Sequence, residues 1–129
     1  MPDQQLIQIA EKFLGDWNTH DVEKVVACYT EDLVYWDPNT RGQIRTQQAL
    51  GRYLAKLFAA WKMHWSLREA HPFKDTNGAA VRWHATFQRA GGGKMAECDG
   101  MDFVLLDGGK VKHNEVYFDR TILASLLGK

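Results

Sequence analysis

Apolar residues recur at helical spacing in three stretches of the first half of the chain. Over residues 4–18 they fall at Leu6, Ile9, Ala10, Phe13 and Trp17, which predicts an amphipathic helix. Asp21 is a suitable N-cap for a second, shorter helix whose apolar side carries Val22, Val25, Val26 and Tyr29. Thr46 is a suitable cap for a third helix, which carries Leu50, Tyr53, Leu54, Leu57, Phe58 and Trp61.

The period of the pattern changes from near four to two after Met63. This predicts strands over 63–74, 79–90, 94–107 and 110–118, separated by the turn sequences DTNG, GGG and DGG. A short strand precedes them at 33–36, and Asp119 is expected to cap a last short helix. Helices followed by an antiparallel meander indicate an α+β fold, with the helices gathered on one face of a curved sheet.

Side-chain alternation assigns faces to the strands. Val81, Trp83, Ala85 and Phe87 point one way and Arg82, His84, Thr86 and Gln88 the other. Over 101–106, however, both faces are largely apolar. Because the helices can cover only one face, a second subunit is expected to cover the other. The sequence therefore predicts a homodimer joined through the outer face, which carries His84, His113, Glu115 and Tyr117.

Length and composition predict a single domain over residues 1–129, with 45% hydrophobic and 25% charged residues. Lysine plus arginine equals aspartate plus glutamate, at 16 each, so no nucleic acid partner is expected. Neither a leader pattern nor a long apolar run is visible, which favours a cytoplasmic protein without a membrane partner. Cys28 and Cys98 are expected to be reduced thiols, and no histidine pair has a metal-ligand spacing.

Two aspartates lie in unusual places. Asp37 ends the apolar run VYWDP, where Asp-Pro-Asn suits a turn but a carboxylate at a pocket's lip also suits a base. Asp102 lies within a predicted strand in GMDFVLL, where aspartate is uncommon and costly to bury unpaired. A pocket-facing acid or a structural ion pair would each explain it.

The same order of elements carries a resemblance to a known family. The stretch FLGDWNTHDVEKVVACYTEDLVYWDPNTRGQIRTQQALGRYL, followed by DGMDFVLLDGGKVKHNEVYFD, resembles the nuclear transport factor 2-like superfamily, in particular its SnoaL-like and ketosteroid-isomerase-like branch. The likeness extends from about residue 5 to 125. It implies a cone, in which a bent sheet wraps around the helices and encloses a pocket. Because the superfamily holds many chemistries, it predicts the fold more closely than the function.

The resemblance also implies roles for single residues. Asp37 matches the general base of the steroid isomerases, including the proline after it, and Asp102 matches their protonated hydrogen-bond donor. Phe13 occupies the position of their oxyanion-donating tyrosine and has no hydroxyl, a loss typically worth ~10²–10³ in rate. Authentic steroid isomerisation is therefore not expected, and neither a cofactor nor a metal is implied. The further residues expected around an apolar ligand are Trp17, Tyr29, Tyr53, Trp83, Phe87, Asn114 and Val116.

Two classes of function remain open at this point. The first is an isomerase, cyclase or lyase that moves a proton next to a carbonyl of an apolar substrate, with Asp37 as base and Asp102 at the enolate oxygen. The second is a module without chemistry, which binds a hydrophobic ligand or serves dimerisation. His71 could also face inward, by its strand spacing from Leu67 and Glu69.

Overall fold

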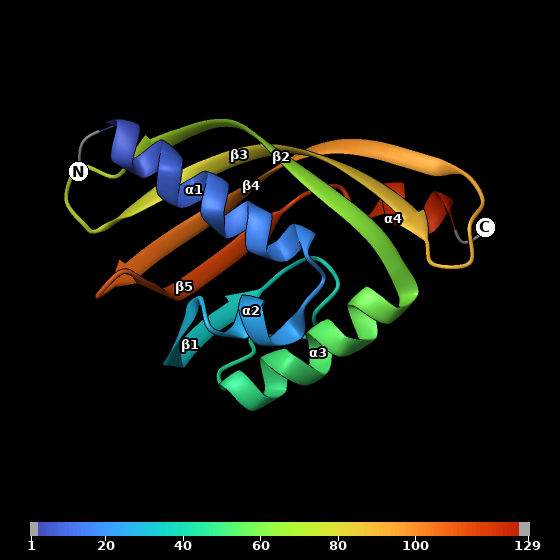
Figure 1. Ribbon diagram of the computed structural model, residues 1–129, viewed down its shortest axis with the longest axis horizontal. Coiled ribbons are helices and arrows are strands. Elements are labelled where there is room, and N and C mark those ends of the chain that lie inside the picture. The colour runs from blue at the N-terminus through green and yellow to red at the C-terminus, as the bar shows by residue number, and fades with distance from the viewer. Residues whose placement is uncertain (1–2, 127–129) are drawn as a thin grey trace.

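The structure is a computed structural model that describes residues 3–126. Its elements confirm the predicted α+β order, with helices preceding most of the sheet (Figure 1). In chain order they are α1 (Asp3–Asn18), α2 (Val22–Val26), β1 (Tyr29–Trp36), α3 (Gln47–Ala60), β2 (Trp61–Pro72), β3 (Gly78–Arg89), β4 (Met95–Asp107), β5 (Lys110–Tyr117) and α4 (Thr121–Ser125).

The sheet has five strands in the order β1-β5-β4-β3-β2. The four later strands form the predicted antiparallel meander, and β1 pairs in parallel with β5. The sequence places Tyr29 on the second helix, but it is the first residue of β1 and lies opposite Val111. Trp61, expected at the end of the third helix, begins β2. In both places strand pairing with distant residues outweighs the local helical pattern.

Local hydrogen bonds fix where the helices begin. The Asp21 carboxylate accepts from the backbone N–H groups of Glu23 and Lys24, and the Thr46 hydroxyl accepts from that of Ala49. Both caps were predicted, and they satisfy donors that the first helical turn leaves unpaired. Asp119 is not the N-cap of α4, which is Arg120, although its carboxylate accepts a hydrogen bond from the N–H of Thr121.

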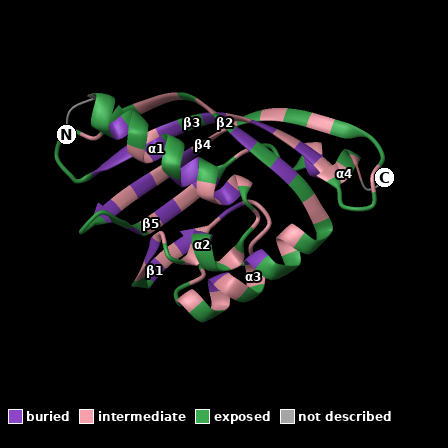
Figure 2. Cartoon of the chain, viewed as in Figure 1, coloured by how far each residue is buried: buried purple, intermediate pink, exposed green. Residues whose placement is uncertain are grey.

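The helices α1 and α3 lie on one side of the curved sheet (Figure 1), and the inner strand positions form the core with them. Buried and less buried positions alternate along β3, β4 and β5 (Figure 2). Val81, Trp83, Ala85 and Phe87 are all buried, as the alternation predicts. The outer positions Met101, Phe103 and Leu105 are only half-buried.

A bulge in β2 reverses the alternation halfway along the strand. Leu67 lies opposite Trp83 but Glu69 lies opposite Arg82, so Arg68 is an extra residue. One extra residue moves every later side chain to the other face. His71 is consequently on the outer face, 64% exposed beside Glu69, and the expectation that it faces inward is wrong.

Candidate active site

Asp37 directly follows β1 and is buried, with 5% of its surface exposed. One carboxylate oxygen, Oδ1, accepts hydrogen bonds from the backbone N–H groups of Asn39 at 2.7 Å and Thr40 at 3.1 Å. The Thr40 hydroxyl also donates to the Asp37 carbonyl oxygen, at 3.0 Å. These bonds form the tight turn that the Asp-Pro-Asn sequence indicates. The turn occupies only one of the two carboxylate oxygens.

The second oxygen of Asp37 is held by two tyrosines. Oδ2 accepts hydrogen bonds of 2.6 Å from the hydroxyl of Tyr35 on β1 and of 2.6 Å from that of Tyr53 on α3. Burial, reinforced by the charge of Asp37, raises the pKa of both tyrosines well above the ordinary value. Both hydroxyls therefore stay protonated donors at ordinary pH. Asp37 therefore makes hydrogen bonds beyond those of the turn, because its second oxygen accepts from Tyr35 and Tyr53.

Asp102 lies at the centre of a second buried network. Its Oδ1 accepts a hydrogen bond of 2.9 Å from the indole nitrogen of Trp83, and its Oδ2 accepts one of 3.3 Å from Nδ2 of Asn114. The Oδ1 of Asn114 in turn accepts from the Tyr29 hydroxyl at 2.7 Å. The network explains how a strand tolerates an aspartate in the core, since no cationic side chain pairs with Asp102 among the described residues.

The two aspartates sit in different electrostatic surroundings. Burial, together with a smaller contribution from the charge of Asp37, raises the pKa of Asp102 to about 6, although the hydrogen bonds from Trp83 and Asn114 oppose the shift. Among the residues that the structure describes, the buried polar side chains are those of Asp37, Asp102 and Asn114, all in these two networks. The polar chemistry of the interior is therefore gathered in one region.

Asp37 and Asp102 line the same inner cavity, of about 30 Å³. A single water molecule needs a cavity of about 10–15 Å³. The inner cavity therefore admits only a small chemical group. Asn39 and Leu57 line both this cavity and an outer groove of about 380 Å³, which lies between α3 and α4. The groove therefore lies directly outside the inner cavity. Its other lining residues are Tyr53, Lys56, Ala60, Trp61, Arg120, Leu123 and Ala124.

The residues expected around a ligand are divided among several places. Trp17, Trp83, Phe87 and Val116 line the inner cavity, and Tyr53 lines the outer groove. Tyr29 and Asn114 belong to the Asp102 network and line neither space. Phe13 packs edge-on against Tyr29 and Trp17, and it lines a separate cavity on the other side of these rings.

Two features of the site were not found from the sequence. Tyr35 is buried and hydrogen-bonded to Asp37. Because it comes two residues before Asp37, at the end of a strand, the period of the strand would have placed both side chains on the same face. The indole nitrogen of Trp17 is buried and has no hydrogen-bond partner among the described residues. A buried donor without a partner is uncommon, and here it belongs to a residue that lines the inner cavity.

The described residues 3–126 contain no cluster of three or more His, Cys, Asp or Glu side chains suited to hold a metal ion. None of the helices in that range has the length and apolar character needed to cross a membrane.

The fold recurs in solved structures of low sequence identity. A proposed isomerase from Bacillus subtilis superposes with a TM-score of 0.86 at 12% identity, covering 99% of this chain and 96% of that one. A proposed polyketide cyclase from Pseudomonas putida gives 0.78 at 14% identity, covering 92% and 94%. A Catenulispora acidiphila protein of ketosteroid isomerase-like fold, in complex with trimethylamine, gives 0.80 at 11% identity, covering 93% and 92%.

These identities establish the fold alone, which is the cone that the sequence resemblance implies. No curated protein matches the chain. The family model of the SnoaL-like domain, however, matches residues 10–114, which include Asp37, Asp102 and Asn114. The chain therefore belongs to the SnoaL-like family.

Proposed function

We propose that the protein is an isomerase, cyclase or lyase that moves a proton next to a carbonyl group of an apolar substrate. The observation that carries this proposal is that Asp37 and Asp102 line one cavity while burial raises the pKa of Asp102 to about 6. Two carboxyl groups in one site, one of them with a raised pKa, are suited to act as base and acid.

In the proposed step the Asp37 carboxylate takes a proton from the carbon next to the carbonyl. The C–H electron pair becomes the new C=C bond, and the carbonyl π pair moves to oxygen. Below about pH 6, where Asp102 is mostly protonated, its carboxyl group donates a hydrogen bond to that oxygen, which stabilises the charge that develops there. The oxygen pair then re-forms the C=O bond, and the C=C pair either takes the proton back from Asp37 at another carbon or expels a leaving group, which receives that proton. Asp37 regains its charge in either case.

Asp37 would reach the substrate through Oδ2, the oxygen that the turn leaves free. Because Tyr35 and Tyr53 both donate to Oδ2, the substrate must displace one of these hydroxyls before the proton can move. The backbone donors on Oδ1 keep the carboxylate oriented meanwhile.

Trp17 would supply the second donor to the substrate oxygen in place of the hydroxyl that Phe13 lacks. Its unpartnered indole nitrogen and its place in the cavity lining support this role. The volumes of the two spaces suggest how a substrate would bind: only its carbonyl edge enters the inner cavity, and its body lies in the outer groove.

The test is proton exchange on simple ketones in deuterium oxide, because it requires no knowledge of the natural substrate. Proton NMR would follow exchange next to the carbonyl in a panel of cyclic ketones and enones, β-tetralone among them. We expect exchange above the buffer rate that Asp37→Asn lowers ~10²–10⁴-fold. Asp75→Asn, a change at an exposed position, is the matched control and should exchange like the unaltered protein.

A module without chemistry gives a different result in the same experiment. It would bind ketones saturably, with no exchange above buffer and no difference between Asp37→Asn and Asp75→Asn. That result would overturn the enzymatic proposal.

A further inference from the structure

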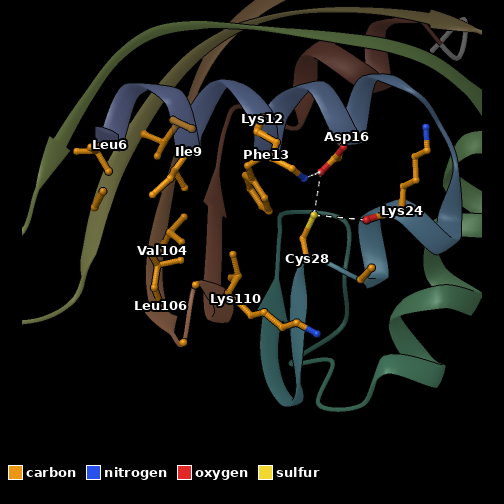
Figure 3. Close-up of a pocket in the computed structure, with 17 residues that line it drawn as sticks. Leu6, Ile9, Lys12, Phe13, Asp16, Lys24, Cys28, Val104, Leu106 and Lys110 are labelled. Carbon is orange, nitrogen blue, oxygen red and sulfur yellow. Dashed lines mark hydrogen bonds and ion pairs between the residues drawn. The ribbon is translucent and has the colours of Figure 1, made fainter. Parts of the chain in front are cut away.

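A second and much larger cavity, of about 450 Å³, lies between α1 and the hairpin of β4 and β5 (Figure 3). It shares no lining residue with the inner cavity or the outer groove. This volume falls in the range of small-molecule sites, about 300–1,000 Å³. The cavity is thus separate from the candidate active site and large enough for a ligand of its own.

One end of this cavity is apolar. Leu6, Ile9 and Phe13 point from α1 toward Val104 and Leu106 on β4 (Figure 3). The side chains of Ala79 and Val81 on β3 add to the same surface. No tryptophan or acidic group lines this end, so it suits a flexible hydrocarbon chain better than a polar ring.

The other end carries positive charge. Lys12, Lys24 and Lys110 line it against one carboxylate, that of Asp16, although the nitrogen of Lys24 points away from the cavity in Figure 3. Asp16 is already engaged, because its Oδ2 accepts from Lys12 Nζ at 2.7 Å and from the Cys28 thiol at 3.3 Å. No ion pair involves Lys24 or Lys110 among the described residues. In Figure 3 the nitrogens of Lys12 and Lys110 both lie at the Cys28 end, away from Leu6.

We propose that this cavity binds an amphipathic carboxylic acid, a medium-chain fatty acid in its simplest form. Its hydrocarbon chain lies between α1 and β4, and its carboxylate lies at the lysine end near Lys110. Lys110, which has no ion-pair partner among the described residues, selects an anionic head group, and the apolar end selects the chain. This site goes beyond the proposed function, since none of its residues serves the proton transfer.

Fluorescence of dansyl-labelled undecanoic acid, displaced by decanoate, tests the site in the full chain. Ile9→Trp fills the apolar end from a half-buried position, and we expect it to weaken decanoate binding at least about tenfold. Ile7→Trp is the matched control, because Ile7 lies on the same helix but is 42% exposed and outside the cavity. Ile9→Trp should leave ketone exchange unchanged, which separates this test from that of the proposed function.

The head group is tested by comparing decanoate with decanol. Decanoate should bind about three- to tenfold more tightly, and Lys110→Gln should remove that difference. Lys112→Gln, an exposed change two residues along β5, is the control that should preserve it. Equal binding by Ile9→Trp and Ile7→Trp, or no binding by the unaltered protein, would overturn the site. Equal affinity for decanol and decanoate would overturn the choice of an acid.

Discussion

The indole nitrogen of Trp83 donates a hydrogen bond of 2.9 Å to Oδ1 of Asp102, and both side chains are buried. The two residues lie diagonally across neighbouring strands, because Trp83 pairs with Gly100 and Asp102 with Val81. This diagonal places the Trp83 ring directly against the backbone of Gly100. Gly100 therefore helps to orient the Asp102 carboxyl group indirectly, because it leaves room for the Trp83 ring that donates to Asp102.

Replacing Gly100 with alanine is expected to disturb that arrangement. A Cβ there would lie 2.3 Å from Cη2 and 2.5 Å from Cζ2 of Trp83, which the rigid indole cannot avoid without moving. We expect a loss of about 1–3 kcal/mol in the free energy of unfolding, measured with urea. Gly15→Ala is the control: Gly15 is exposed on α1 with nothing within 4 Å, so its replacement should stabilise by up to about 1 kcal/mol. Equal effects of the two changes would contradict the role of Gly100.

The raised pKa of Asp102 predicts how stability depends on pH. Because the folded pKa is about 6 and the ordinary value 3.8, Asp102 favours the folded state below about pH 4, and this contribution is lost as pH rises through about 6. The loss amounts to about 3 kcal/mol. Asp102→Asn does not titrate, so its free energy of unfolding relative to the unaltered protein should rise by about that amount between about pH 4 and 8. Asp75→Asn should show no such trend, and a pH-independent difference for Asp102→Asn would contradict the shift.

Sequence patterns predicted those parts of the fold that local interactions decide. The caps at Asp21 and Thr46 need only a side chain and the backbone two or three residues away. The inward set at Val81, Trp83, Ala85 and Phe87 follows from the period of a regular strand. The family resemblance then predicted that these elements form a cone and that Asp37 and Asp102 are candidate catalytic residues.

The predictions that were wrong concern features that depend on interactions between distant parts of the chain. Tyr29 belongs to a strand because Val111, near the other end of the chain, pairs with it. His71 faces outward because a single extra residue at Arg68 shifts the register of β2. No residue type in that stretch indicates a bulge. The division of the interior into two cavities depends on how Phe13, Trp17 and Tyr29 pack together, which periodicity does not specify.

Removing the hydroxyl of Tyr53 is expected to separate its structural and chemical effects. Tyr53→Phe loses a 2.6 Å hydrogen bond to Asp37, which should lower the free energy of unfolding by about 1–3 kcal/mol. If Oδ2 of Asp37 is the base, the same change should speed ketone exchange, because one competitor for that oxygen is gone. Tyr117→Phe is the control, since Tyr117 is exposed and donates to Glu115 on the outer face. Slower exchange in Tyr53→Phe would contradict this competition and indicate that the Tyr53 hydroxyl assists the proton transfer.

The outer face of the sheet gives the last prediction, that the protein forms a homodimer. Phe103 is half-buried there, packs against Phe73 and His113, and is continuous with the exposed ring of Tyr117 on the neighbouring strand. An apolar strip of this kind on a sheet with helices on its other side is typically covered by a partner. Sedimentation velocity at micromolar concentration should therefore give twice the chain mass of 14.8 kDa.

A charge placed on this strip should dissociate the dimer without unfolding the subunit. Phe103→Asp puts a carboxylate on the outer face of β4, where a single subunit can hydrate it but a dimer interface would bury it unpaired. We expect the sedimenting mass to fall to one chain while the circular dichroism spectrum is retained. Lys62→Asp, at an exposed position on the edge strand β2, two strands away from β4, should leave the dimer intact. A single-chain mass for the unaltered protein would refute the dimer, and a dimer that survives Phe103→Asp would place its interface elsewhere on the molecule.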